Sequence, residues 1–80
     1  MKIRVTVFAR LKDFFEPEFF VELPAGSTVA TAIAALGERR PPARDVLAAS
    51  RAALDETFVP PQHILNDGAE LFLLPPSSGG

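Results

Sequence analysis

The 80-residue sequence lacks cysteine, tryptophan and tyrosine, and it contains a single histidine, His63. Without cysteine no disulfide can hold the fold together, so a disulfide-rich secreted domain is excluded. One histidine cannot build a zinc site alone, and we expect no bound metal or cofactor. A chain this short buries only about 60–65% of its unfolded surface, so the hydrophobic residues, 48% of the chain, must supply the stability through an apolar core.

Basic charge and long apolar runs are also scarce. The ten acidic residues slightly outnumber the eight basic ones, for a net charge of −2, whereas a nucleic-acid-binding domain usually shows a basic surplus. No apolar stretch approaches the ~20 residues that span a membrane. Residues 1–4 alternate apolar and charged side chains, which is typical of a strand and not of a signal peptide. We therefore expect a cytoplasmic protein whose partners include neither nucleic acid nor membrane.

Two segments near the N-terminus alternate apolar and polar residues, as half-buried β-strands do. They cover residues 2–8 and 18–23, and the connection between them is expected to hold one helical turn before Pro17. The two strands are expected to pair as an antiparallel hairpin. The side chains that share the apolar face are Ile3, Val5 and Val7 in the first strand and Phe19, Val21 and Leu23 in the second.

The clearest helix is predicted over residues 28–37. Ser27 or Thr28 can cap its start, and Gly37 is expected to follow its last turn as the C′ residue. Pro41-Pro42 prevents the helix from resuming. The narrow apolar stripe of this helix consists of Val29, Ile33 and Leu36.

The second half of the chain begins with two short elements and ends with a strand. Residues 43–50 are predicted to form a short helix, and residues 52–59 a short edge strand. Asn66-Asp67-Gly68 is a turn signal. Residues 69–74 are apolar on both faces, which is typical of a strand in the middle of a sheet. The side chains that the short helix buries are expected to be Val46 and Leu47.

This order of elements predicts an α+β domain over residues 1–74. A mixed sheet of about four to five strands packs on one main helix, with the last strand in the middle, parallel to the first. That arrangement is a β-grasp. An open ferredoxin-like sandwich is the competing topology, but it needs two substantial helices and the second helix here is short.

Residues 75–80 form a tail with a distinct composition. Pro75-Pro76 favours an extended exit from the last strand, Ser77-Ser78 is polar and flexible, and Gly79-Gly80 has no side chains. Six residues reach about 20 Å from the fold, and a bare end can enter a channel too narrow for a Cβ atom. On the tail alone, an ordinary frayed terminus is the better interpretation. Combined with the β-grasp prediction, the tail is better read as the working end of the molecule.

With these residues the chain resembles the small sulfur-carrier subunit of molybdopterin synthase, in the MoaD/ThiS group of ubiquitin-like proteins. The resemblance spans the whole length and includes the Phe8-Ala9-Arg10-Leu11 connector. It is sharpest from Asn66-Asp67-Gly68 through Pro75-Pro76 to Gly79-Gly80, and the double proline is typical of the molybdopterin branch. Asp55-Glu56 and the Pro41-Pro42 linker depart from the usual pattern but do not touch the tail.

The resemblance implies a chemistry that is carried by the chain end. An ionised carboxylate is a poor acyl donor, so an ATP-dependent E1-like enzyme would adenylate Gly80, and a sulfur donor would then displace AMP to leave a thiocarboxylate. The carrier would dock on the large synthase subunit, in a hetero-oligomer expected to be a heterotetramer, and give its sulfur to a pterin precursor. The activating partner uses the ATP, and this chain is not catalytic alone.

Partner contacts are expected around the tail. The chain has seven phenylalanines, and we expect some of them on a partner-facing patch, although for any single one the core is the better interpretation. The six that so small a core cannot easily hide together are Phe8, Phe14, Phe15, Phe20, Phe58 and Phe72. Phe72 and Leu74 fall on the face of the last strand opposite Leu71 and Leu73, next to the tail, and with Phe8 they are the predicted contact residues. The tail residues predicted to contact the partner are Pro75, Pro76, Ser77 and Ser78, with Gly79 preceding the reactive Gly80.

Other readings remain open at this point. The carrier could serve thiamin or another metabolite, or the chain could be a ubiquitin-like modifier joined through Gly80 to lysines, or a plain interaction module. Two further features are expected to be structural: His63 as a loop residue, and a solvated set of arginines. These arginines are Arg39, Arg40, Arg44 and Arg51.

Overall fold

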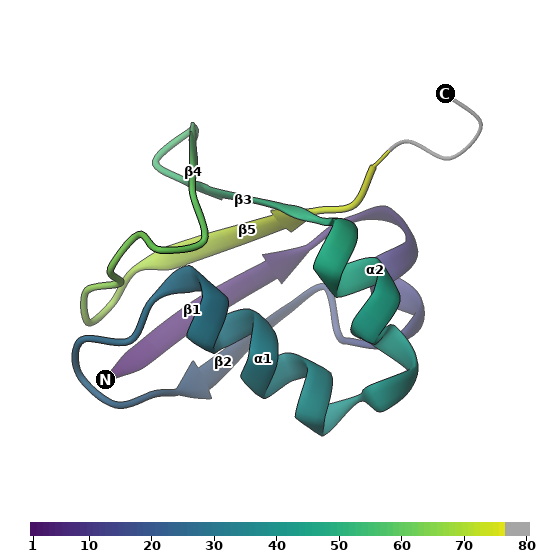
Figure 1. The fold of residues 1–80 in the computed structure, drawn as a ribbon, viewed down its shortest axis with the longest axis horizontal. Coiled ribbons are helices and arrows are strands. Elements are labelled where there is room, and N and C mark those ends of the chain that lie inside the picture. The colour runs from purple at the N-terminus through teal and green to yellow at the C-terminus, as the bar shows by residue number, and fades with distance from the viewer. Residues whose placement is uncertain (77–80) are drawn as a thin grey trace.

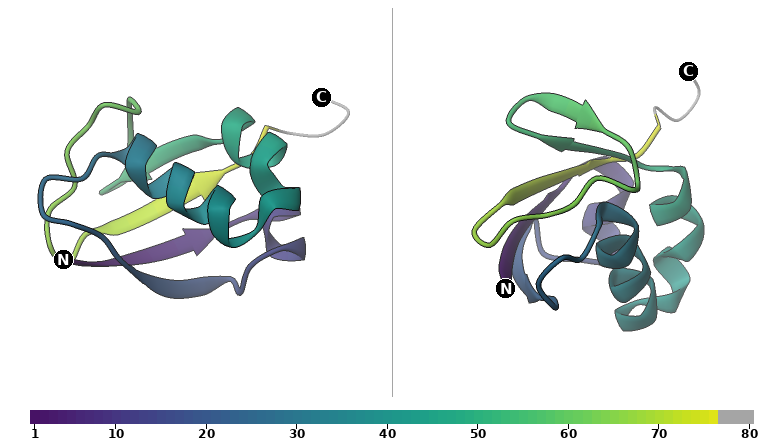
Figure 2. Two further views of the ribbon diagram at one scale, coloured as in Figure 1. Left: turned by 60° about the horizontal axis from the view of Figure 1, so that its bottom comes forward. Right: turned by 60° about the vertical axis from the view of Figure 1, so that its left-hand side comes forward.

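The structure is a computed structural model that describes residues 1–76. Its five strands form one mixed sheet in the order β2-β1-β5-β3-β4, and the helices cover one face of that sheet (Figures 1 and 2). The predicted β-grasp is therefore confirmed, and the ferredoxin-like alternative is excluded. The elements are β1 (Lys2–Val7), η1 (a 3-10 helix, Ala9–Asp13), β2 (Glu18–Glu22), α1 (Val29–Arg39), η2 (a 3-10 helix, Pro41–Ala43), α2 (Arg44–Ala49), β3 (Arg51–Leu54), β4 (Thr57–Val59) and β5 (Glu70–Leu74).

The first and last strands form the centre of the sheet. β1 pairs antiparallel with β2 and parallel with β5, with Val5 opposite Leu71 and Val7 opposite Leu73. All four of these side chains are buried against the helices. The middle position of β5 explains its apolar residues on both faces, as the sequence predicted.

The turn before β5 ties the two ends of the described chain together. The backbone N–H of Lys2 donates to Oδ1 of Asp67 at 2.8 Å, and the N–H of Gly68 donates to the carbonyl of Lys2 at 2.9 Å. Gly68 has φ +84°, a conformation that glycine adopts without strain. The predicted Asn66-Asp67-Gly68 turn is confirmed, and it sets the position at which β5 enters the sheet.

Helix α1 begins as predicted, but its end differs. The Thr28 side chain caps the helix by accepting from the N–H of Thr31 at 3.2 Å. Gly37 lies inside the helix and is buried, so the prediction of Gly37 as the C′ residue was wrong. The helix continues to Arg39 and stops at Arg40, because the following Pro41 disfavours helical backbone in the residue before it. Gly37 instead permits a close approach of α2.

Residues 52–59, predicted as one edge strand, form most of a hairpin. β3 and β4 pair antiparallel, and the two-residue connection Asp55-Glu56 has φ values of +49° and +63°. Positive φ at both central residues is the geometry of a type I′ turn. The prediction failed because such turns usually carry Asn-Gly or Asp-Gly, and Asp-Glu gives no comparable signal. The edge position itself is correct, since β4 borders the sheet.

The core lies between the sheet and the helix layer. Leu36 from α1 and Leu47 from α2 are fully buried, and Val46 packs against the core while half-buried, so α2 buries the residues that the sequence indicated. The buried hydroxyl of Ser27 donates to the carbonyl of Pro24 at 2.7 Å. No helix within residues 1–76 has the length and apolar character needed to cross a membrane.

Candidate functional site

The face of the sheet that the helices leave uncovered carries alternate residues of each strand. In the strand register, Phe72 of β5 lies opposite Thr6 on one side and Ala53 on the other, and Ala53 lies opposite Phe58 of β4. Because paired residues point to the same face, these four side chains form one row across β1, β5, β3 and β4. The row crosses the sheet close to the end at which β5 leaves it.

Phe8 joins this row from the end of β1. Its ring meets that of Phe72 edge to face, with centroids 5.9 Å apart and planes at 87°, the geometry that aromatic pairs prefer. Phe8 is 37% exposed, and Ala9 after it has φ +52°, which turns the chain into η1. Leu74 lies on the same face of β5, two residues beyond Phe72. The structure thus brings together the three contact residues that the sequence predicted.

Phe58 belongs to the same surface, although it was not among the three contact residues that the sequence predicted. Phe58 is 51% exposed, whereas Ala53, on the same face, is only 7% exposed because its neighbours cover it. The alternation of Thr57, Phe58 and Val59 was visible, but it assigns a face only once the β3–β4 turn is known. We call this set of side chains the tail-root surface; it consists of Phe8, Ala53, Phe58, Phe72 and Leu74.

The chain leaves the sheet directly beside the tail-root surface. Pro75 is half-buried and Pro76 is exposed, and both follow β5 without an intervening turn (Figure 1). Ser77-Ser78 and Gly79-Gly80, which were predicted to contact a partner and to carry the chemistry, lie outside the described residues. Of the tail, the structure therefore describes only its first two residues, Pro75 and Pro76.

The remaining part of the uncovered face is charged. Arg4 pairs with Glu18 of β2 and, at 3.5 Å, with Glu70 of β5. The hydrogen bond to Glu18, followed by the charges of Glu18 and Glu70, raises the pKa of Arg4 above its usual value. Lys2 lies with its Nζ atom 4.4 Å from the centroid of the Phe20 ring. The uncovered face thus divides into an ion-paired part and the apolar tail-root surface.

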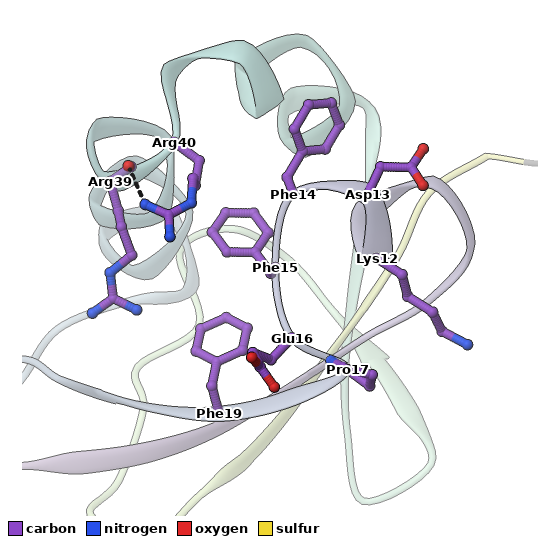
Figure 3. A pocket seen from close by; sticks show the side chains of 9 residues that line it. All are labelled: Lys12, Asp13, Phe14, Phe15, Glu16, Pro17, Phe19, Arg39 and Arg40. Atoms are coloured by element: carbon purple, nitrogen blue, oxygen red, sulfur yellow. Dashed lines mark hydrogen bonds between the residues drawn. The ribbon is translucent and has the colours of Figure 1, made fainter.

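A pocket of about 490 Å³ opens elsewhere, between η1, the start of β2 and the end of α1 (Figure 3). Phe15 and Phe19 stack in it with ring centroids 5.4 Å apart, and the Arg39 guanidinium lies 5.9 Å from the Phe19 ring. Arg40 donates to the carbonyl of Arg39 at 3.0 Å. These phenylalanines close the edge of the core, so they are structural and separate from the tail-root surface.

The arginines and the histidine take the places expected for surface residues. Arg39 and Arg40 border the pocket, Arg44 lies against α1 near Gly37, and Arg51 lies on the other side of the sheet, so they do not form one basic patch. His63 is an exposed loop residue, as predicted. In the part of the chain that the structure describes, no group of three or more His, Cys, Asp or Glu side chains could hold a metal ion.

The sequence and fold can be compared with known proteins. The chain matches the ThiS family over residues 5–80. Its structure is similar to that of SAMP1 from Haloferax volcanii, with a TM-score of 0.85, 22% identity and coverage of 100% of both chains. It is also similar to a Pyrococcus furiosus protein assigned as molybdopterin converting factor, subunit 1, with a TM-score of 0.82, 26% identity and coverage of 95% of this chain and 98% of that one. A third similar structure is the complex of subunits 1 and 2 of the molybdopterin-converting factor from Helicobacter pylori, with a TM-score of 0.71, 25% identity and coverage of 100% of both chains.

Proposed function

The chain belongs to the ThiS family of ubiquitin-like sulfur carriers, and from that premise we propose that it is the small subunit of a molybdopterin synthase. The observation that carries this proposal is the position of the tail. β5 ends at Leu74, beside three exposed or half-exposed phenylalanines, and continues directly into Pro75-Pro76. In the sequence, Gly79-Gly80 lies only two residues beyond Pro76. The similarity to the Pyrococcus furiosus and Helicobacter pylori proteins supports the molybdopterin pathway.

The proposed chemistry takes place on the carboxylate of Gly80. An E1-like partner uses ATP to form the Gly80 acyl-adenylate with release of pyrophosphate. A sulfur donor then attacks the acyl carbon, AMP leaves, and a thiocarboxylate remains. This chain binds no cofactor for these steps, and it contains no cysteine that could hold the sulfur instead. Its role is to present the carboxylate to enzymes that supply the catalytic groups.

The tail-root surface is the proposed docking site for the large synthase subunit. Exposed aromatic side chains that cluster at one place are typical anchors of protein interfaces. The Helicobacter pylori structure is a complex of subunits 1 and 2, and we propose a partner of the same kind here, in a heterotetramer. Docking would direct the tail into the active site of the large subunit. There the Gly80 thiocarboxylate would be held next to the pterin precursor, so the two need not meet by diffusion.

The direct test is conversion of the chain end. We expect incubation with the E1-like enzyme, ATP and a sulfur source to replace one oxygen by sulfur at Gly80, as measured by intact-mass spectrometry. Adding the large subunit and the pterin precursor should return the mass to that of the carboxylate. A variant that lacks Gly80 should keep its fold and fail both steps. An unchanged mass with a competent E1-like enzyme would contradict the proposal.

The same proteins and reagents distinguish this function from the other candidate functions. A thiocarboxylate that forms but is not consumed with the large subunit would point to thiamin or another sulfur acceptor. Isopeptide-linked conjugates on lysines, detected through Gly80, would indicate a protein modifier. The similarity to SAMP1, at 22% identity, concerns the fold alone and does not favour that role.

A further inference from the structure

Arg51 brings a positive charge to the edge of the tail-root surface. It lies opposite Leu74 in the register of β3 with β5, so it is next to the strand residue from which the tail leaves. The guanidinium carbon of Arg51 lies 3.7 Å from the centroid of the Phe58 ring. Arg51 therefore stacks on an exposed member of the surface that is proposed to dock.

The charge of Arg51 has no counter-charge among residues 1–76. Both ion pairs found in that range involve Arg4, in the ion-paired part of the uncovered face, and the Arg51 side chain makes no hydrogen bond there. Stacking on Phe58 covers one flat side of the guanidinium. The N–H groups lie in the guanidinium plane, so stacking leaves them free to donate.

Docking of the tail-root surface would remove water from around this charge. A charge that loses water without gaining a partner weakens binding, whereas a carboxylate opposite a guanidinium forms two parallel hydrogen bonds and restores the lost interaction. A guanidinium held in place by an aromatic ring also loses less side-chain freedom on binding. The partner that fits this surface is an apolar patch with an Asp or Glu at its border.

We propose that Arg51 is a specificity-determining residue that recognises a carboxylate of the large synthase subunit. This inference rests on the proposed function, because it names the partner chemistry of the same surface. The tail-root surface itself is apolar, and Arg51 adds a guanidinium at its border, where it can pair with an acidic group of the partner. A partner that presents Lys or Arg opposite Arg51 would be rejected by the like charge.

The test measures the affinity of the full-length chain for the large subunit from the same genome by isothermal titration calorimetry. We expect Arg51→Glu to weaken binding about tenfold or more, and Arg51→Gln to weaken it less. The affinity of the wild type should fall with added salt more steeply than that of Arg51→Gln. Replacing the matching Asp or Glu of the large subunit by Arg should restore binding to Arg51→Glu. Arg44→Glu, the same charge change on α2, should bind as the wild type does.

The outcomes separate this inference from the function on which it rests. If Arg51→Glu binds like the wild type while Phe72→Ser weakens binding, the proposed recognition of a carboxylate by Arg51 is overturned, whereas the tail-root surface remains the docking site. Equal salt dependence of wild type and Arg51→Gln, or no rescue by any acidic-to-Arg change in the large subunit, also overturns it. If the wild type does not bind the large subunit at all, the proposed function and the inference fall together. Circular dichroism of each variant separates loss of binding from loss of fold.

Discussion

The rings of Phe8 and Phe72 meet edge to face, with centroids 5.9 Å apart, and they link the end of β1 to the middle of β5. Phe8 follows the last residue of β1, and Phe72 occupies the middle of β5. The two residues are 64 positions apart in the chain, since 72 minus 8 is 64, yet they stand on one surface beside the tail. A contact between the first and last strands therefore helps to define the place where a partner would meet the chain end.

The Phe8–Phe72 pair should be measurable as an interaction energy. In a double-mutant cycle with Phe8→Ala and Phe72→Ala, we expect a coupling of about 0.5–1.5 kcal/mol, because the edge-to-face contact adds to simple area burial. Urea unfolding of the four proteins gives the value. A cycle between Phe8 and Phe20, whose rings lie in different parts of the face, serves as the control and should show additive effects. Additivity for Phe8 and Phe72 would contradict the contact.

Phe58 and Phe20 offer a matched pair for the docking surface. Both are about half exposed, at 51% and 55%, and both lie on the uncovered face of the sheet. Phe58 belongs to the tail-root surface, whereas Phe20 lies under Lys2 in the ion-paired part. We expect Phe58→Ser to weaken binding of the large subunit by about tenfold or more and Phe20→Ser to leave it nearly unchanged. Calorimetric titration decides, and equal effects of the two changes would remove the tail-root surface as the docking site.

The turn at Asp55-Glu56 stores strain that a glycine would relieve. Glu56 has φ +63°, a region that costs a residue with a Cβ atom about 1–2 kcal/mol. Glycine relieves this strain, but it also loses more conformational freedom on folding, and that loss offsets part of the gain. We therefore expect Glu56→Gly to stabilise the protein by about 0.5–1 kcal/mol. Chemical unfolding measures the change. Gln62→Gly, in an exposed turn without a positive φ, should give no gain, and a loss of stability for Glu56→Gly would contradict the turn geometry.

Gly37 offers a test of the approach between α1 and α2. Alanine is a better helix former than glycine by about 1 kcal/mol, but a Cβ at Gly37 would stand 3.2 Å from the Cγ atom of Arg44. Arg44 is exposed and flexible, so its side chain can move by the few tenths of an ångström required. We expect Gly37→Ala to stabilise the fold by up to about 1 kcal/mol, as read from thermal and urea unfolding.

The companion variants fix the cause of that change. Arg44→Ala removes the atom that crowds the new Cβ, so the gain from Gly37→Ala should be larger in the Arg44→Ala background. Gly37→Val adds two more methyl groups toward Leu47 and should lose stability instead. If Gly37→Ala itself destabilises the protein even with Arg44→Ala, then backbone packing of the helix, and not the Arg44 side chain, sets the limit.

Much of the fold could be predicted because its strongest elements have local causes. The alternation in residues 2–8 and the turn residues at Asn66-Asp67-Gly68 act within a few positions, and they placed the central strands correctly. Gly37 was misjudged because a glycine near a helix end looks the same whether it ends the helix or makes room for a neighbour. Only the packing of α2 against α1 distinguishes the two cases.

The candidate site likewise combines features that have a local cause in the sequence with features that depend on contacts between distant segments. The face shared by Phe72 and Leu74 comes from the two-residue period of a strand, so it could be predicted from one segment. Phe58 and Arg51 reach that face only through the register of β3 with β4 and β5, which depends on a turn without a recognisable sequence signal. Pairings between distant segments are set by the whole fold, and no local pattern records them.

The central position of β5 has a consequence for the synthesis of this protein. Until β5 has been made, β1 lacks its parallel neighbour, and no strand pairs the β3–β4 hairpin with the β1–β2 hairpin. Pairings so distant along the chain form late and slowly. The tail-root surface is built from both halves of the chain, so a full-length chain that has not yet folded cannot present it. A partner that recognises this surface would therefore bind folded chains and pass over unfolded ones, although both carry Gly80.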